Sequence, residues 1–353
     1  MRRDFVVVLV LAGVLATASV YGRWAATPVH GTDHPYVVLY DPPRTRAEAM
    51  LVQGDGQAFA ALAQDPTLSR PEVFNGSAAA VSPAHEAAYR AGRPLLAWLA
   101  WLVSLGQPER VPFALLALTV LGAMILVCGA ALAAARLNRR VEWTLLVLML
   151  PGSVILFAWT GPEALAVGLA LIGLVLWPDH RWPAVLALTL GVLARETLLL
   201  VPVAMAVSEA ARRRPFLPLL LPVLTLGAWD LIDRARYGAL PTAAAEGRLS
   251  APWNSWSAIS QWHPIDIAIG MLGVALVIGG IVRLPPLWKS VLAAYIGLAL
   301  FMGPDVWKRW QDFSRPLLPL YVIGFLACIP IAQGHADTRV AMPADEGPRR
   351  RDN

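Results

Sequence analysis

Charge is scarce in this sequence. Charged residues fill 15% of its 353 positions and hydrophobic residues fill 57%. Soluble domains carry about 25% charged residues, so this shortage excludes a soluble globule and a disordered chain. Apolar runs recur from residue 5 to residue 333, which excludes a protein with a single anchor. Because the runs are continuous and do not alternate with polar residues, they predict an all-α protein with many transmembrane helices.

Cysteine is rare in this sequence, and common catalytic motifs of soluble enzymes are absent. Cys128 and Cys328 are the only cysteines, and both lie in apolar segments, so no disulfide framework or cysteine metal site is predicted. Walker A, His-Glu-x-x-His and Gly-x-Ser-x-Gly motifs are missing. His30 and His34, with Asp33 between them, have no third ligand nearby, and we interpret them as a polar loop. No metal site or other cofactor is predicted, although a need for Mg²⁺ or Mn²⁺ is left open.

The apolar stretches predict a bundle of about ten spans, with an uncertainty of two. They cover residues 5–21, 111–135, 142–160, 164–177, 183–194, 198–208, 216–232, 265–281, 290–302 and 316–333. Several are shorter than the roughly 20 residues that cross a bilayer core. Only Arg195-Glu196-Thr197 separates 183–194 from 198–208, so these two form either a hairpin or one bent helix. The first stretch has an alternative as a cleaved signal peptide, since Ala16-Thr17-Ala18 resembles a cleavage site.

The placement of basic residues predicts the orientation. Under the positive-inside rule, Arg2 and Arg3 place the N-terminus in the cytoplasm, and the clusters 136–140 and 212–214 mark cytoplasmic loops. The rule therefore explains the isoelectric point near 9.5 without nucleic acid as a partner. Both termini are expected inside. Residues 1–333 are expected to form one membrane domain, followed by a disordered cytoplasmic tail over 334–353.

Residues 22–110 form the one long loop, predicted outside the cell. Loops of this length are usually functional or disordered. Within it, residues 57–63 have a helical composition, and the apolar stretch 95–102 is too short to span. We expect the latter to lie in the membrane surface as an interfacial helix, with Trp98 and Trp101 as anchors.

Several short motifs, in order along residues 5–330, resemble the pattern of one family of membrane proteins. Gly54-Asp55-Gly56-Gln57-Ala58-Phe59 resembles the acidic motif of the first outer loop, and Arg93-Pro94-Leu95-Leu96 resembles a second motif that follows it. Leu193-Ala194-Arg195-Glu196-Thr197 and Phe313-Ser314-Arg315-Pro316-Leu317-Leu318-Pro319 resemble later segments. In Thr160-Gly161-Pro162-Glu163 the acid is displaced by two positions from the family pattern, so no role is assigned to Glu163.

In their order, these motifs resemble those of the GT-C superfamily, and the resemblance implies an activity. GT-C proteins, which include the PIG-V-like mannosyltransferases and the aminoarabinose transferases, are polytopic glycosyltransferases that use polyprenyl- or dolichyl-phosphate sugars. The expected function is transfer of a sugar, with inversion, from a polyprenyl-phosphate donor to a glycan, lipid or protein acceptor of the cell envelope. The reaction is expected on the outer face of a bacterial inner membrane, with membrane lipids as further partners.

The resemblance and the charges beside apolar runs together select six site residues. Asp55 is the expected catalytic base, with a helix N-cap as its alternative role. The expected ligands of the donor phosphate or lipid are Arg90, Arg93, Arg195, Glu196 and Arg315. The alternatives are a mutual ion pair of Arg195 with Glu196, and arginines that reach ordinary lipid headgroups.

Two other functions remain open at this stage. A transporter or lipid flippase would also need many spans and embedded charges, but the halves of the sequence show no internal repeat. A non-catalytic protein with the architecture of an enzyme family is the third hypothesis. Phe59 at the position of a family tyrosine and the displaced Glu163 keep it open.

Overall fold

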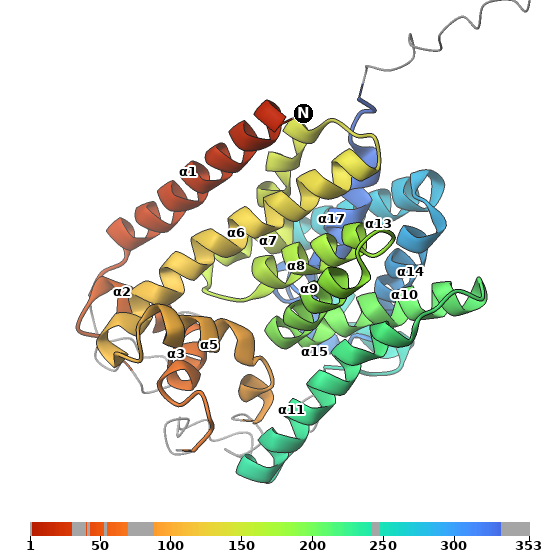
Figure 1. Ribbon diagram of the computed structural model, residues 1–353. Coiled ribbons are helices and arrows are strands. Elements are labelled where there is room, and N and C mark those ends of the chain that lie inside the picture. The colour runs from red at the N-terminus through yellow and green to blue at the C-terminus, as the bar shows by residue number, and fades with distance from the viewer. Residues whose placement is uncertain are drawn as a thin grey trace, which may run out of the picture.

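The computed structural model describes residues 2–29, 40, 43–52, 55–69, 88–241 and 248–332. Helices are the regular elements of this part of the chain, and strand pairing there is limited to two isolated bridges. The all-α prediction is therefore confirmed. Figure 1 shows the helices packed side by side into a bundle, with short helices gathered at one end.

Each of the ten predicted apolar stretches contains helical structure. The long elements are α1 (Arg2–Ala26), α6 (Val111–Arg136), α8 (Glu163–Leu176), α9 (Arg181–Ala194), α10 (Leu200–Ala211), α11 (Leu221–Tyr237), α13 (Pro264–Arg283), α14 (Pro286–Phe301) and α17 (Leu318–Cys328). The stretch 142–160 is divided into the 3₁₀ helix η3 (Val141–Met149) and α7 (Pro151–Ala158). Shorter helices are α2 (Arg46–Val52), α3 (Gly56–Gln64), α5 (Pro94–Val103), α12 (Trp256–Ile259), α15 (Pro304–Trp307), α16 (Trp310–Ser314), η2 (Pro108–Arg110), η4 (Glu196–Leu199), η5 (Leu217–Leu220) and η7 (Pro252–Ser255).

Length and hydropathy make three of the described helices candidate membrane spans. They cover Arg3–Ala26, Pro108–Arg136 and Pro264–Arg283, and η3 with α7 would add a fourth if this pair, bent by 59°, is one span. Other apolar helices, such as α8 and α9, have only 10–17 residues. A straight helix of 14 residues is about 21 Å long, which is less than the bilayer core of about 30 Å. The lengths therefore support a membrane protein but do not confirm ten spans.

Small residues bring the central helices close together. A Cβ atom on Gly168 of α8 would lie 2.6 Å from the backbone of Ile125 in α6, and one on Gly129 of α6 would lie 2.6 Å from the Gly168 carbonyl oxygen. Glycine is thus required on both sides of this contact. Close approach through small residues is the usual way in which helices pack in a membrane, where lipid removes most of the hydrophobic driving force.

The two ends of the bundle differ in content. The start of α1, the end of α6 and the last described residues lie at one end (Figure 1). There Arg139 forms a bridge with Ile331, and the Arg140 N–H donates to the Pro330 carbonyl oxygen at 3.0 Å. The helices α2, α3 and α5 lie at the opposite end (Figure 1). The basic loop 136–140 and the short helices of the first loop are therefore separated by the length of α6.

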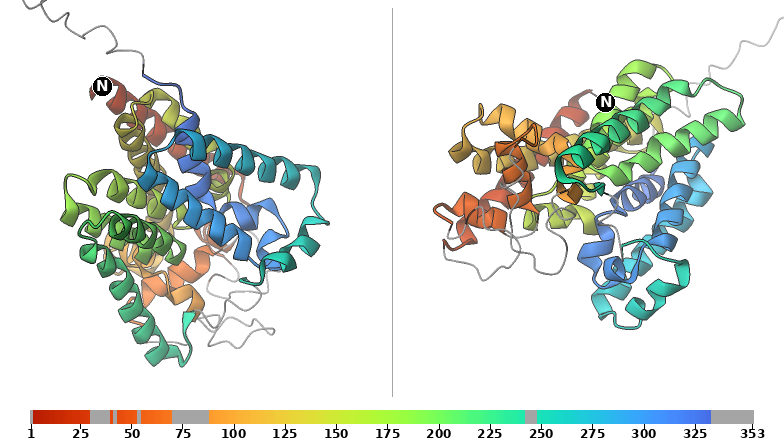
Figure 2. Two further views of the ribbon diagram at one scale, coloured as in Figure 1. Left: turned by 90° about the vertical axis from the view of Figure 1, so that its right-hand side faces the viewer. Right: turned by 90° about the horizontal axis from the view of Figure 1, so that it is seen from below.

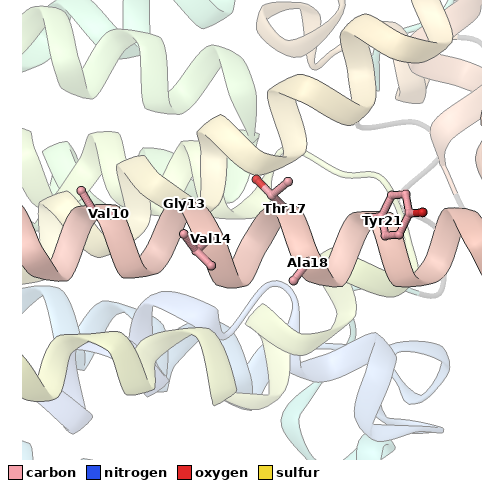
Figure 3. Close-up of a pocket in the computed structure, with 6 residues that line it drawn as sticks. All are labelled: Val10, Gly13, Val14, Thr17, Ala18 and Tyr21. Atoms are coloured by element: carbon pink, nitrogen blue, oxygen red, sulfur yellow. The ribbon is translucent and has the colours of Figure 1, made fainter.

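Apolar side chains cover much of the outer surface. On α1, Val6, Val10 and Val14 are each more than half exposed. A shallow hollow of about 520 Å³ runs along this helix, lined by Val10, Gly13, Val14, Thr17, Ala18 and Tyr21 (Figure 3). The helices α13, α14 and α17 pack together on another side (Figure 2), where α13 also exposes Ile278 and Val282. Such faces suit contact with lipid tails.

The stretch predicted to be an interfacial helix is α5. Its two tryptophans differ from the expectation of paired surface anchors. Trp101 is 41% exposed, but Trp98 turns inward, where its indole N–H donates to the Pro66 carbonyl oxygen at 3.1 Å. Its ring also packs edge-on against Trp229 of α11 with centroids 4.9 Å apart. Trp98 thus joins α5 to the turn after α3 and to α11.

Candidate functional site

Charged side chains meet where the short helices of the first loop contact the ends of the apolar helices. Arg315, which caps α16, lies between two carboxylates: its Nη2 is 2.9 Å from Asp55 Oδ2 and 2.6 Å from Glu163 Oε1. The second oxygen of Asp55 accepts a hydrogen bond from Arg90 Nη1 at 2.5 Å. Asp55 is therefore held by two guanidinium groups from different parts of the chain.

A second set of contacts extends this arrangement through Arg195 and Arg93. Arg195 forms an ion pair with Glu163, which thereby joins Arg195 to Arg315. Arg93 contacts Glu196 through two parallel hydrogen bonds, Nε to Oε2 at 2.6 Å and Nη2 to Oε1 at 2.7 Å. Paired contacts of this kind fix both direction and distance. We call the seven residues Asp55, Arg90, Arg93, Glu163, Arg195, Glu196 and Arg315 the charged cluster.

The local backbone explains why Asp55 is available to the cluster. Asp55 occupies the N-cap position of α3, but its side chain makes no capping hydrogen bond. The carboxylate instead contacts Arg90 and Arg315. The alternative that Asp55 is a helix cap is therefore wrong for its side chain. The helix predicted at 57–63 is confirmed as α3 and serves to present Asp55.

Arg195 and Glu196 are likewise directed to separate partners. Arg195 ends α9 in an extended conformation, with φ −152° and ψ 120°, and the short helix η4 begins at Glu196. Their partners are Glu163 for Arg195 and Arg93 for Glu196. The alternative of a mutual ion pair at a hairpin tip is therefore wrong. The break between α9 and α10 (through η4) favours the interpretation of two helices over one bent helix.

The cluster has a buried side and a more open side. Side-chain exposure is 2% for Glu163, 4% for Arg93 and 8% for Arg195. It rises to 14% for Arg315, 21% for Asp55 and 36% for Glu196. Buried charges need partners because their transfer from water is costly. The inner ion pairs thus hold the outer groups, which are the more accessible members of the cluster.

The charges of the cluster do not cancel. Four arginines and three carboxylates leave a net charge of +1. Burial alone would raise the pKa of Asp55, but the guanidinium groups of Arg315 and Arg90 reverse this effect and hold its pKa well below its usual value. Asp55 is consequently ionised at neutral pH, and the cluster as a whole favours an anion.

Several buried polar atoms beside the cluster have no hydrogen-bond partner. They include Arg195 Nε and the hydroxyl oxygens of Ser153, Thr160, Thr197 and Ser314. Thr160, Thr197 and Ser314 are within three residues of a cluster member in the sequence. Ser153 follows Gly152, which packs closely against Ser314, because a Cβ atom on Gly152 would overlap the Ser314 carbonyl oxygen. Unsatisfied buried donors are rare in folded proteins. Their concentration here indicates a place for water or ligand oxygen atoms.

All six residues selected from the sequence lie in the cluster, and the structure adds Glu163 as its seventh member and Tyr89 as a neighbour. Glu163 bridges Arg195 and Arg315, although its displacement from the family pattern gave it no role. The Tyr89 hydroxyl accepts a hydrogen bond from Arg93, and the Tyr89 ring lies beneath Arg93 and Arg248. The sequence signal for Glu163 was an acid directly before an apolar helix, which needs a cationic partner when buried.

Other charged and aromatic residues of the outer loops are not part of the cluster. Lys308 pairs with Asp305 at 2.5 Å, and both are more than half exposed. Trp253 is 72% exposed, whereas Trp262 stacks on Phe313 with ring centroids 5.3 Å apart. Cys128 and Cys328 are free thiols. His30, Asp33 and His34, like the predicted tail 334–353, lie outside the described residues.

The described residues contain no group of three or more His, Cys, Asp or Glu side chains placed to hold a metal ion. The cluster is therefore best described as an arginine–carboxylate site with an excess of positive charge. Comparison of the chain with protein-family models, with curated proteins and with solved structures found no significant match to any of them.

Proposed function

We propose that this protein is a membrane glycosyltransferase that transfers a sugar from a polyprenyl-phosphate donor to an acceptor hydroxyl at the outer surface of a bacterial inner membrane. The acceptor is a glycan, lipid or protein of the cell envelope. The observation that carries the proposal is the charged cluster, because it joins the six selected residues at the end of the bundle opposite the basic loop 136–140.

The net charge of the cluster supports a phosphate-linked donor. A phosphodiester carries one negative charge, which matches the excess of +1 among the seven residues. Arginine is well suited to phosphate because its planar guanidinium group forms two parallel hydrogen bonds. Arg90 and Arg315, the more exposed arginines, would contact the donor phosphate, while Arg93 and Arg195 remain paired with Glu196 and Glu163.

The apolar surroundings support a lipid tail on that donor. The cluster adjoins helices whose outer faces are apolar, and three or four of the described helices are candidate spans. A polyprenyl chain would lie along these faces with its phosphate at the level of the cluster. We further propose that the shorter apolar helices complete a bundle of about ten spans, with both termini in the cytoplasm and the first loop outside.

In the proposed reaction, the acceptor oxygen attacks the anomeric carbon from the side opposite the phosphate. The bond between that carbon and the phosphate oxygen breaks, and its electron pair stays on the phosphate, where Arg315 and Arg90 stabilise the new charge. Asp55 takes the proton of the acceptor hydroxyl. Attack from the opposite side inverts the configuration of the sugar.

The ion pairs of Asp55 make its role as base depend on the donor. While Arg315 and Arg90 hold both of its oxygens, the pKa of Asp55 stays well below its usual value and the group is a weak base. A phosphate that binds these arginines competes for their charge and hydrogen bonds. The proposed donor would thereby raise the pKa of Asp55 and strengthen it as a base when the substrate is in place.

The proposal is tested with the full chain purified in detergent or nanodiscs and supplied with a panel of polyprenyl-phosphate sugars. We expect release of polyprenyl phosphate from at least one donor, a loss of about 100-fold or more in Asp55→Asn, and little change in Asp305→Asn on the exposed surface. Turnover that survives Asp55→Asn would remove Asp55 as the base. Vectorial movement of lipid in proteoliposomes, without turnover of any donor, would favour a flippase or transporter.

A further inference from the structure

Asp233, near the end of α11, is a buried carboxylate that the charged cluster does not include. Its exposed fraction is 0%, and neither of its oxygens has a hydrogen-bond partner. An ionised or neutral carboxyl group buried in this way costs free energy unless a donor reaches it. Among the buried side chains of the described residues, it is the only carboxylate in this condition.

The face of α11 that carries Asp233 packs against the segment that leads into α5. One turn before Asp233, the Trp229 indole N–H donates to the Ala91 carbonyl oxygen at 2.8 Å. Ala91 lies between Arg90 and Arg93 of the cluster. Because residues four apart share a helix face, Asp233 lies on the same side of α11 as Trp229, the side that contacts the segment contributing two arginines.

Charge interactions connect Asp233 to the cluster through a second carboxylate. The charge of Glu196 acts on Asp230, and that of Asp230 acts on Asp233. Glu196 is in turn held by Arg93. The short helix η4, which begins at Glu196, packs against α11, so the helix that carries Asp230 and Asp233 borders the cluster on the side of Glu196, its most exposed carboxylate.

The surroundings of Asp233 favour a neutral donor of hydrogen bonds over a cation. Arg234 and Arg236 flank it on α11 and are exposed, so they repel an approaching positive charge without satisfying the carboxylate. No group of three acidic or other metal-binding side chains occurs in the described part of the chain that would hold a metal ion there. A pair of sugar hydroxyls, by contrast, donates two hydrogen bonds to the two oxygens of one carboxyl group.

We propose that Asp233, assisted by Asp230, is a subsite for the hydroxyl groups of the sugar carried by the donor. This inference rests on the proposed function, since it assigns the sugar to the α11 side of the cluster and the phosphate to Arg90 and Arg315. Asp233 binds and orients the sugar; it takes no part in proton transfer.

The experiment measures binding of the full chain, in nanodiscs, to polyprenyl phosphate alone and to polyprenyl phosphate that carries mannose, glucose or an amino sugar. In the unmodified protein we expect one neutral sugar to increase affinity about tenfold over the sugar-free lipid, the gain from two net hydrogen bonds. Asp233→Asn and Asp233→Leu are expected to lose this gain but to bind the sugar-free lipid normally. Glu209→Gln, which alters a buried carboxylate on α10, is the matched control.

The outcomes separate the two proposals. If the gain from the sugar persists in both Asp233 variants, the subsite is overturned while the phosphate site stands. If the variants bind sugar-free lipid poorly and also melt earlier than Glu209→Gln, Asp233 is structural and the inference is again overturned. If only the amino sugar increases the affinity, Asp233 binds a cationic group and not sugar hydroxyls, and the inference is overturned. If the unmodified protein binds none of the lipids, the proposed function itself fails.

Discussion

Arg315 and Glu163 are 152 positions apart in the sequence, and Arg315 Nη2 lies 2.6 Å from Glu163 Oε1. The same guanidinium contacts Asp55, so three remote segments of the chain meet at one side chain. Glu163 is 2% exposed at the start of α8, and Arg315 connects it to the partly exposed Asp55. Arg315 therefore contributes both to the stability of the bundle, through Glu163, and to the proposed chemistry of the site, through Asp55.

Removal of Arg315 should therefore affect both. In Arg315→Gln, Glu163 keeps only Arg195 and Asp55 keeps only Arg90, so each carboxylate is less well compensated. Loss of one partner from a buried ion pair costs about 3 kcal/mol. We expect a clearly lower apparent melting temperature and loss of binding to polyprenyl phosphate. Lys308→Gln, in an exposed pair, should melt as the unmodified protein does; equal melting of both variants would contradict a central role for Arg315.

The low pKa of Asp55 predicts how its contribution to stability depends on pH. A carboxyl group whose pKa is lower in the folded than in the unfolded protein stabilises the fold above the unfolded pKa, which is about 3.9. That contribution disappears as the pH falls through the folded pKa. The difference in melting temperature between the unmodified protein and Asp55→Asn should be constant from pH 5 to pH 8 and shrink below about pH 4. A difference that changes between pH 5 and pH 8 would show that the arginines do not hold Asp55.

The contact of Arg93 with Glu196 is suited to a double-mutant cycle. The variants Arg93→Gln and Glu196→Gln each leave one charge of a paired contact without its partner. We expect a coupling energy of about 1–3 kcal/mol from the melting of the two single variants and the double variant. Arg136 and Asp179, which are about half exposed and 3.0 Å apart, form the control pair. Coupling no larger than in that pair would mean that the Arg93–Glu196 contact is not maintained in the membrane.

Much of the fold could be predicted from hydropathy, because a continuous apolar run has few conformations other than a helix in a membrane. Each predicted stretch from 5–21 to 316–333 contains a helix. Where the chain bends could not be predicted as well: η3 and α7 divide one stretch at Leu150-Pro151, and proline removes the hydrogen bond that would continue the helix. The number of spans also depends on how short helices such as α9 sit in the bilayer, which their sequence does not specify.

The members of the charged cluster could be predicted better than their pairing. A charge next to an apolar run must find a partner, and this argument, together with the family resemblance, selected Asp55, Arg93, Arg195, Glu196 and Arg315. Partners are set by tertiary contacts, so the sequence neighbours Arg195 and Glu196 were weighed as a pair although they bind Glu163 and Arg93. Glu163 received no role because a family pattern was compared position by position. The helix that starts at Glu163 directs its side chain into the cluster nonetheless.

The orientation proposed for the bundle predicts which residues are labelled from outside the cell. After replacement of Cys128 and Cys328, single cysteines would be introduced at exposed positions of the two ends. We expect a cysteine at Asp305 to react with a membrane-impermeant maleimide in intact cells and one at Arg140 to react only after permeabilisation. The reverse pattern would place the charged cluster in the cytoplasm and exclude a donor on the outer face.

Gly161 provides a test of Glu163 that leaves every charge in place. A Cβ atom at Gly161 would overlap Glu163 Oε2, so the carboxylate at the end of this buried side chain would have to move. Gly161→Ala should therefore displace the carboxylate from Arg195 and Arg315, lower the melting temperature and reduce turnover of any active donor. Gly297 on α14 has no atom within 4 Å of an added Cβ, so Gly297→Ala should be neutral or slightly stabilising because alanine favours a helix. If Gly161→Ala behaves like Gly297→Ala, the position of Glu163 between the two arginines is not required. A loss of turnover without any loss of stability would instead assign Glu163 chiefly to holding Arg315 for the donor phosphate.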